Sequence, residues 1–387
     1  RRTIARITRR PAKLRIGVDI RSFYEPLTGI GWYLYHLLHE IAKSDDVELY
    51  LFGDARVTDI GPTLHAEVPA SAHLCWFDAR GRGRIARVDR ALTAAAYVLW
   101  MWIVDVDVMF APNYFLPRLL AAVARRRVIT IHDLTYKRFP ELLQKETLDN
   151  LERHMAHEIA VADTIICVSE STRQDLLRHY QVDAQRAITI HSGVDVTTGD
   201  PARDVASEVA RLHKYILFVS TIEPRKNLDV LLDAFDKLQS RGAYDGSLVI
   251  AGRIGWKAEK LVARLRRPGV VHLDYVHASS LAAVYKAADM FVFPSIYEGF
   301  GFPLLEAMSL GVPAIAARSS SLPEIGGNGA LYFDPRSADD LAQVIERVAH
   351  DANLRRQLIE RGLAQAARFR WSDAAAKTLT VLRAAAA

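Results

Sequence analysis

The sequence predicts an α/β protein made of two doubly wound parallel sheets, and three observations lead to this class. The chain has 387 residues, which is more than a single hydrophobic core usually supports, so two domains of about 150–200 residues are expected. Short apolar runs alternate with helical segments along both halves of the chain. The runs are continuously apolar, which is typical of parallel strands that helices cover on both faces.

In the first half, a loop with Gly29-Ile-Gly31 separates the first strand from the first helix. Ser169 is expected to cap the helix that follows it, because a serine hydroxyl can accept a hydrogen bond from a free N–H of the first helical turn. The expected strands cover residues 14–19, 47–52, 106–110, 127–131, 164–168 and 187–190, and the expected helices cover 32–42, 85–104, 145–162 and 170–180.

Residues 193–210 are polar and lack strong periodicity, so they are expected to link the two domains. The strands expected after the linker cover 215–220, 247–251, 270–273, 290–294 and 313–316, and the helices cover 228–239, 257–265, 281–287, 303–310 and 338–351. Trp371 interrupts the helical segment 354–387 and is expected to anchor a tail helix. We therefore predict a first domain over 1–195, a second over 196–365, and a tail over 366–387 whose helix crosses back to the first domain.

The net charge of +5 is unevenly distributed, because three basic clusters lie in the first third of the chain. They are the seven basic side chains of residues 1–15, the group Arg80, Arg82, Arg84, Arg87 and Arg90, and the run Arg125-Arg126-Arg127. Two interpretations stay open: solvated faces with a disordered arm, or attraction to an anionic membrane or a phosphorylated acceptor. Nucleic acid is not an expected partner, because no nucleic-acid-binding motif accompanies the charge.

Cysteine usage and hydropathy indicate a cytoplasmic protein. Cys75 and Cys167 lie in apolar contexts, so free buried thiols and a reducing compartment are expected. No apolar signal-peptide core follows the first arginines. Residues 85–104 include Arg87, Asp89 and Arg90, which favours a buried or an interfacial helix over a membrane span.

No metal site is expected. Asp105-Val-Asp107 has the spacing of a divalent-metal motif, but it enters an early apolar strand at the edge that lies away from a ligand. His73 lies two residues before Cys75, but no second ligand pair accompanies them.

Residues 298–306 read Glu298-Gly-Phe-Gly-Phe-Pro-Leu-Leu-Glu306 and are the most informative part of the sequence. One carboxylate is placed on the loop after a buried strand, and the second lies one turn into the next helix. The glycines allow backbone N–H groups to approach a ligand closely, and a helix N-terminus favours an anion. This combination predicts a ligand that is part phosphate and part polyol.

Charged and polar side chains follow two other strands at their carboxyl ends. Arg225-Lys226 comes between a strand and a helix, where two cations oppose the helix dipole unless an anion lies beside them. A diphosphate would supply that anion, and an arginine can bind it through two parallel hydrogen bonds. His132-Asp133 follows the strand 127–131 and is expected to face the cleft between the domains.

Three segments together resemble one known family. Glu298-Gly-Phe-Gly-Phe-Pro-Leu-Leu-Glu306 with its continuation to Pro313 resembles the donor-site signature of the retaining glycosyltransferases of family 4 (group 1), which have the GT-B fold. Ser321-Leu-Pro-Glu-Ile-Gly326 and Phe218-Val-Ser-Thr-Ile-Glu-Pro-Arg225-Lys226-Asn227 are similar to further parts of this signature. The resemblance covers residues 15 to about 371, and it implies two Rossmann-like domains that face each other across a cleft.

The resemblance implies roles for individual residues. It gives catalytic roles to His132, Arg225, Lys226 and Glu298, and donor-binding roles to Gly29, Gly31, Ser220, Tyr275, Val276, Gly299, Phe300, Gly301, Phe302, Leu305 and Glu306. Glu298 and His132 would contact the transferred sugar, and Glu306 would bind the ribose hydroxyls of the nucleotide. Ser220 stands where the family usually has glycine. The family uses a nucleotide sugar and needs no metal or other cofactor.

The resemblance is strongest to bacterial mannosyltransferases of surface polysaccharide assembly. It implies mannose from GDP-mannose as donor, a lipid-linked or lipopolysaccharide glycan as acceptor, and work at the inner face of the cytoplasmic membrane. A UDP-hexose or a dTDP-linked deoxysugar stays open as donor. A nucleotide-sugar epimerase stays open as a different class of enzyme, since the same architecture serves both.

Overall fold

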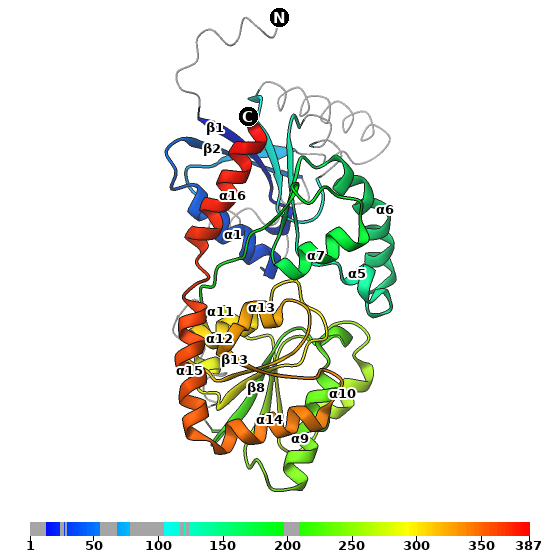
Figure 1. Cartoon of the computed structure of the whole chain (residues 1–387), viewed down its shortest axis with the longest axis vertical. Helices are drawn as coiled ribbons and strands as arrows, with labels where there is room; N and C mark the ends of the chain where they lie inside the picture. The colour runs from blue at the N-terminus through cyan, green and yellow to red at the C-terminus, as the bar shows by residue number, and fades with distance from the viewer. Residues whose placement is uncertain are drawn as a thin grey trace, which may run out of the picture.

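The computed structural model describes residues 13–23, 27, 29–54, 68–77, 104–116, 120, 124–196, 209 and 211–387 (Figure 1). Two sheets form two lobes, which we call the N-domain and the C-domain. The strand orders are β3-β2-β1-β4-β5-β6-β7 and β10-β9-β8-β11-β12-β13. Adjacent strands are parallel in both sheets, and each order reverses beside its first strand, at β1 and at β8. The predicted pair of doubly wound sheets is confirmed.

The N-domain sheet consists of β1 (Leu14–Asp19), β2 (Val47–Asp54), β3 (His73–Phe77), β4 (Val108–Ala111), β5 (Arg127–Ile131), β6 (Thr164–Cys167) and β7 (Ala187–Thr189). Its helices are α1 (Gly29–Ile41), α5 (Thr135–Arg138), α6 (Lys145–Val161) and α7 (Glu170–His179), with short 3-10 turns at Arg21–Phe23 and Pro140–Leu142. The sequence did not predict β3, a short edge strand that pairs with β2 alone. Ser169 caps α7 as predicted, and its hydroxyl accepts from the Thr172 N–H.

The expected loop at residues 29–31 is wrong, because α1 begins at Gly29. Glycine normally weakens a helix, but packing overrides this preference here. A Cβ at Gly31 would lie 2.8 Å from Leu27 Cδ2 and 3.2 Å from the Ser22 carbonyl oxygen. Only a residue without a side chain lets the first turn of α1 sit this close to the preceding segment.

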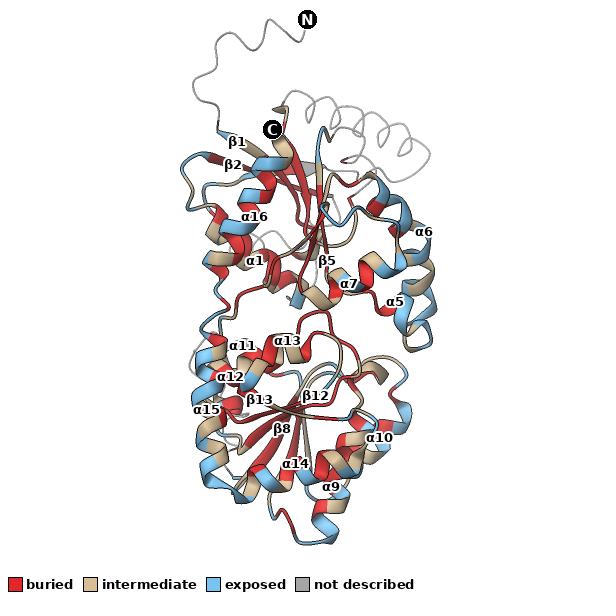
Figure 2. Ribbon diagram, viewed as in Figure 1, coloured by how far each residue is buried: buried red, intermediate tan, exposed pale blue. Residues whose placement is uncertain are grey.

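The C-domain sheet consists of β8 (Tyr215–Val219), β9 (Ser247–Ala251), β10 (Val270–Asp274), β11 (Met290–Phe293), β12 (Ala314–Ala317) and β13 (Ala330–Phe333). Its helices are α9 (Leu228–Ser240), α10 (Glu259–Leu265), α11 (Ala278–Lys286), α12 (Phe302–Ser309), α13 (Leu322–Gly326), α14 (Ala338–His350) and α15 (Ala352–Ala366), with 3-10 turns at Pro224–Lys226 and Gly327–Gly329. Strand β13 was not predicted, and it too is an edge strand. Buried residues line the strands and the helix faces that cover them (Figure 2).

The tail helix α16 (Trp371–Ala386) leaves the C-domain and packs against α1 of the N-domain (Figure 1). The predicted crossing back is therefore present. Leu382 of this helix is fully buried, and Trp371 is 7% exposed. Near the end of α16, Arg383 Nη2 forms an ion pair with Asp46 Oδ2 at 2.7 Å.

Several sequence-based expectations lie partly or wholly outside the described residues. These are the basic arm over residues 1–12, the arginines between 80 and 90, and nearly all of the expected helix 85–104. The exact domain limits 1–195, 196–365 and 366–387 stay a prediction. Cys75 and Cys167 are free and buried, and burial raises the pKa of each thiol to about 12.

The described acidic pair near β4 has structural partners. Asp107 Oδ2 accepts a hydrogen bond from the Arg15 N–H at 2.9 Å, and Asp105 is paired with Arg125. Among the residues that the structure describes, no group of three or more His, Cys, Asp or Glu side chains is arranged to hold a metal ion. In the same part of the chain, no helix combines the length and apolarity that crossing a bilayer requires.

We expect Leu382→Ala to lower the free energy of unfolding of the N-domain by about 2–5 kcal/mol, because it leaves a cavity where α16 docks. Urea denaturation followed by circular dichroism measures this. Leu363→Ala is the matched control, since Leu363 is 44% exposed on α15; it should cost less than about 0.5 kcal/mol. Equal small effects of both changes would contradict the docking of α16 in the N-domain core.

Candidate active site

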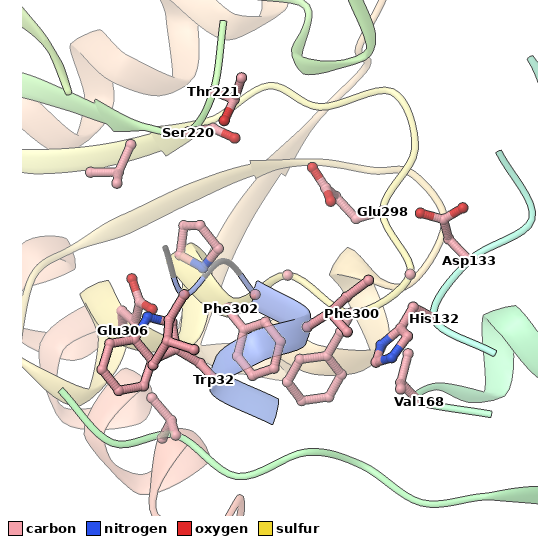
Figure 3. A pocket seen from close by; sticks show the side chains of 18 of the residues that line it. Trp32, His132, Asp133, Val168, Ser220, Thr221, Glu298, Phe300, Phe302 and Glu306 are labelled. Atoms are coloured by element: carbon pink, nitrogen blue, oxygen red, sulfur yellow. The ribbon is translucent and has the colours of Figure 1, made fainter. Parts of the chain in front are cut away.

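A cavity of about 650 Å³ lies between the two domains, at the carboxyl ends of strands from both sheets (Figure 3). His132 follows β5, Val168 follows β6, Ser220 follows β8, and Glu298 comes from the loop after β11. Doubly wound sheets bind ligands at this edge, where the strand order reverses. The cavity is therefore the candidate site.

Most residues predicted for the site line this cavity. They are Gly29, His132, Ser220, Arg225, Lys226, Glu298, Gly299, Phe300, Gly301, Phe302 and Glu306. Four predicted residues are not among the described residues that line the cavity, namely Gly31, Tyr275, Val276 and Leu305. Leu305 is fully buried, Val276 is 8% exposed, and Tyr275 is 42% exposed beneath the Arg253 guanidinium at 4.3 Å. Donor binding by these four residues stays a prediction.

The loop of residues 297–302, which we call the Glu298 loop, requires its glycines. Gly301 has φ +110° at the start of α12, a conformation that favours glycine. A Cβ at Gly299 would lie 1.6 Å from the carbonyl oxygen of His132, which belongs to the other domain. The backbones of the two domains therefore meet directly at Gly299, and this contact fixes His132 and Asp133 opposite the loop (Figure 3).

Glu298 is the centre of a buried cluster of charges. Its Oε1 lies 2.6 Å from Lys226 Nζ and its Oε2 lies 3.0 Å from Arg225 Nη1, while Arg225 Nη2 also pairs with Glu223 Oε1 at 2.8 Å. Burial alone would raise the pKa of Glu298, but the positive charges of Arg225 and Lys226 outweigh it and hold that pKa below its usual range. Two cations thus meet two carboxylates in one buried cluster.

Glu306, which lies eight positions after Glu298 in the sequence, has a different environment. The Tyr285 hydroxyl donates to Glu306 Oε2 at 2.8 Å, and no described cation forms an ion pair with this carboxylate. Burial raises the pKa of Glu306, and the hydrogen bond from Tyr285 offsets this only in part. The carboxylate therefore has unused capacity to accept hydrogen bonds from a bound ligand.

His132 is held in one tautomer. Its Nε2 lies 2.7 Å from the carbonyl oxygen of Pro112, which can only accept, so Nε2 carries the proton. Burial lowers the pKa of His132, which favours the neutral ring. In the neutral ring Nδ1 then keeps a lone pair that can accept a hydrogen bond from a ligand hydroxyl.

The structure also brings residues to the cavity that the sequence analysis did not assign to it. Trp32, Trp256 and Trp371 contribute to its wall. The Trp371 ring stacks on His36 with centroids 4.8 Å apart, so the predicted tail anchor also shapes the site. Trp32 directly follows the Gly29-Ile-Gly31 segment, and this position was the available signal for its role. No local pattern marked Trp256.

The sequence of this chain matches a known protein family over most of its length. The family model "Glycosyltransferase Family 4" matches residues 27–198, and the model "Glycosyl transferases group 1" matches residues 206–365. The chain is 32% identical over 380 residues to the O-antigen chain mannosyltransferase B of Escherichia coli, covering 92% of this chain and 96% of that protein. The protein belongs to the family 4 (group 1) glycosyltransferases.

A second relative and one solved structure are also similar to this chain. The serotype-specific mannosyltransferase WbdA of Escherichia coli is 28% identical over 230 residues, which cover 56% of this chain and 28% of that protein. Anabaena HepE, solved in complex with UDP and glucose, has a TM-score of 0.71 at 18% identity, over 96% of this chain and all of that one (100%). The latter likeness supports the GT-B fold. The family models and the relative that is 32% identical show that the protein is a glycosyltransferase.

We expect Glu298→Gln to destabilise the ligand-free protein at neutral pH, and Glu306→Gln to cause no loss of stability. The first leaves Arg225 and Lys226 under-neutralised and should cost about 3–5 kcal/mol of unfolding free energy. The second removes a carboxylate whose ionised form burial disfavours, so stability should stay constant or rise.

The pH dependence of these two variants should also differ. Because the pKa of Glu298 is lowered on folding, its contribution is present above the usual carboxyl range and is lost as pH falls through the lowered pKa. The penalty at Glu306 is complete above its raised pKa, shrinks as pH falls through that pKa, and is gone below the usual carboxyl range. Chemical denaturation across a pH series measures both, and equal losses at neutral pH would contradict the assignment.

Proposed function

We propose that the protein transfers mannose from GDP-mannose, with retention of anomeric configuration, to a lipid-linked or lipopolysaccharide glycan. The mannosyltransferases among its relatives support the sugar, and the O-antigen relative supports the class of acceptor. The observation that carries the proposal is the buried pair Arg225 and Lys226 beside Glu298, in a cavity that both domains line. A nucleotide-sugar epimerase would need the donor alone, whereas this cavity offers an N-domain wall for a second substrate.

The donor diphosphate would lie against Arg225, Lys226 and the start of α12. Departure of the nucleotide places negative charge on the β-phosphate, and preorganised positive groups stabilise that charge where water is excluded. The N–H groups at Gly299–Phe302 and the helix dipole of α12 add to this stabilisation. Burial and the neighbouring Arg225 lower the pKa of Lys226, and the negative charge of an arriving phosphate would oppose this shift and favour the charged ammonium group.

Sugar and ribose hydroxyls would be held by three side chains. Glu298 would accept from hydroxyls of the mannose while it stays paired with the two cations, and His132 would accept at Nδ1 from another hydroxyl. Glu306 lies apart from Glu298 in Figure 3 and would accept from the ribose hydroxyls. All three are positioning roles that orient the reacting carbon.

The transfer would proceed on one face of the sugar. The acceptor oxygen forms a bond to the anomeric carbon as the bond from that carbon to the phosphate oxygen breaks, and the acceptor proton moves to the departing phosphate. The phosphate takes the proton, so no side chain need act as general base. Since Arg225 and Lys226 would supply the positive charge, the reaction would need no metal.

We also propose that the enzyme works at the inner face of the cytoplasmic membrane. A lipid-linked acceptor is presented there, and the basic clusters in the first third of the chain suit an anionic surface. Peripheral contact of this kind needs no membrane-spanning segment.

We expect GDP to raise the unfolding temperature far more than UDP or dTDP at equal concentration, because a ligand that binds only the folded state stabilises it by about 2.7 kcal/mol at a hundred times its Kd. Transfer from GDP-mannose to a mannose-terminated lipid-linked glycan should then be followed by NMR of the product anomer. Stronger stabilisation by UDP, or a product of inverted configuration, would overturn the proposal.

We expect Lys226→Ala to lower kcat by at least about a hundredfold, since it removes charge stabilisation that matters most in the transition state. Glu306→Ala should mainly raise the KM for the donor, since it removes contacts to ribose. Lys260→Ala, an exposed lysine on α10, is the matched control and should behave as wild type. Near-wild-type kinetics of the first two variants would refute the assignment of the site.

A further inference from the structure

A carboxylate of the C-domain caps a helix of the N-domain. Glu324, on α13, accepts hydrogen bonds from the backbone N–H groups of Glu170 at 2.7 Å and Ser171 at 3.0 Å. Both groups belong to the first turn of α7, whose free N–H groups and positive dipole end favour an anion. His191, just after β7, also contacts Glu324, with Nε2 and Oε1 2.5 Å apart. One acidic side chain thus joins two N-domain elements.

The residues around this contact also hold the Glu298 loop. The hydroxyl of Ser169, which caps α7, donates to the Gly299 carbonyl at 2.6 Å. On the other side, the hydroxyl of Ser321 is shared between the carbonyls of Glu298 at 2.9 Å and Phe300 at 2.8 Å. Ser321 stands three residues before Glu324, at the start of α13. The loop is therefore held between α13 and the start of α7, and the Glu324 contact links these two helices.

A second contact ties the same helix to the other end of the loop. The Tyr297 hydroxyl donates to Asp175 Oδ2 of α7 at 2.9 Å and accepts from the Leu134 N–H at 3.2 Å. Helix α7 thus meets the C-domain on both sides of Gly299, where a Cβ would lie 1.6 Å from the His132 carbonyl oxygen. The separation of His132 from Glu298 depends on how closely α7 and the loop approach.

We propose that Glu324 is a positioning residue for glycosyl transfer, which holds the two domains at the separation that brings His132 to the Glu298 loop. Glu324 is not among the described residues that line the interdomain cavity, so it acts through α7 and the loop rather than on the substrate. Its carboxylate is partly accessible, with 22% of the side chain exposed, so it can release α7 when the domains separate. The kinetic part of this inference rests on the proposed mannosyl transfer.

The test uses the full-length protein and the variant Glu324→Gln. A glutamine keeps the size of the side chain but loses the charge, and its NH₂ group would face a backbone N–H that needs an acceptor. Glu346→Gln is the matched control, because Glu346 lies on α14 of the same domain and pairs only loosely with Arg241, at 4.0 Å. Spin labels at Asp45→Cys and Glu360→Cys, both exposed, report the distance between the domains. The native cysteines are buried and should not be labelled.

We expect Glu324→Gln to lengthen or broaden the distance distribution in the ligand-free protein and to lower kcat by about tenfold or more. The Kd of GDP, measured by calorimetry, should stay at the value of the Glu346→Gln control, because the donor wall of the C-domain is intact. An unchanged distance distribution, an unchanged kcat, or a loss of GDP affinity equal to the loss of kcat would each overturn the inference. If wild type fails to use GDP-mannose, the proposed function fails, and the distance measurement still decides the role of Glu324.

Discussion

The candidate active site depends on one buried cluster in which two carboxylates balance two cations. Glu298 holds Lys226 and Arg225 within 3.0 Å in the ligand-free protein, and Glu223 completes the balance. Isolated cations buried this deeply would lose their charge or destabilise the domain. With Glu298 in place, two positive groups stay preorganised at the carboxyl end of β8, where a diphosphate would meet them. The same residues therefore offer positive charge to a diphosphate and determine the stability of the C-domain.

The close approach of the domains is the second constraint. Only glycine at position 299 allows the Glu298 loop to touch the His132 backbone, and hydrogen bonds from both domains surround that contact. Trp256 Nε1 adds another, since it donates to the Leu142 carbonyl at 2.8 Å. Groups from separate domains thus complete one cavity, which suits an enzyme that joins two substrates and must also open to admit them.

Much of the fold could be predicted from the sequence, because continuous apolar runs and helical periodicity are local signals. The strands that were missed, β3 and β13, are edge strands that each gain pairing energy from a single neighbour. The start of α1 was placed too late because glycine normally opposes a helix, whereas close packing against Leu27 favours it here.

The sequence motifs predicted which residues belong to the site, but not how these residues contact one another. Arg225, Lys226, Glu298 and Glu306 were assigned through the family signature and line one cavity. The pairing of Glu298 with Arg225 and Lys226 was not predictable, because Lys226 lies 72 positions before Glu298 and sequence spacing carries no distance. The segment Ser321-Leu-Pro-Glu-Ile-Gly326 was noticed, yet the partner of Glu324 lies 154 residues away on another domain. Contacts of this kind exist only after both domains have folded.

The position of α16 has a consequence for synthesis of the chain on the ribosome. Its buried residues, among them Leu379 and Leu382, complete the core of the domain that is translated first. Until α16 has been translated, the N-domain lacks these apolar side chains beside α1. A nascent chain without α16 would offer the uncovered face of α1 to chaperones and proteases. The core of the N-domain is therefore completed only after the C-domain has been translated, which couples quality control of one lobe to synthesis of the other.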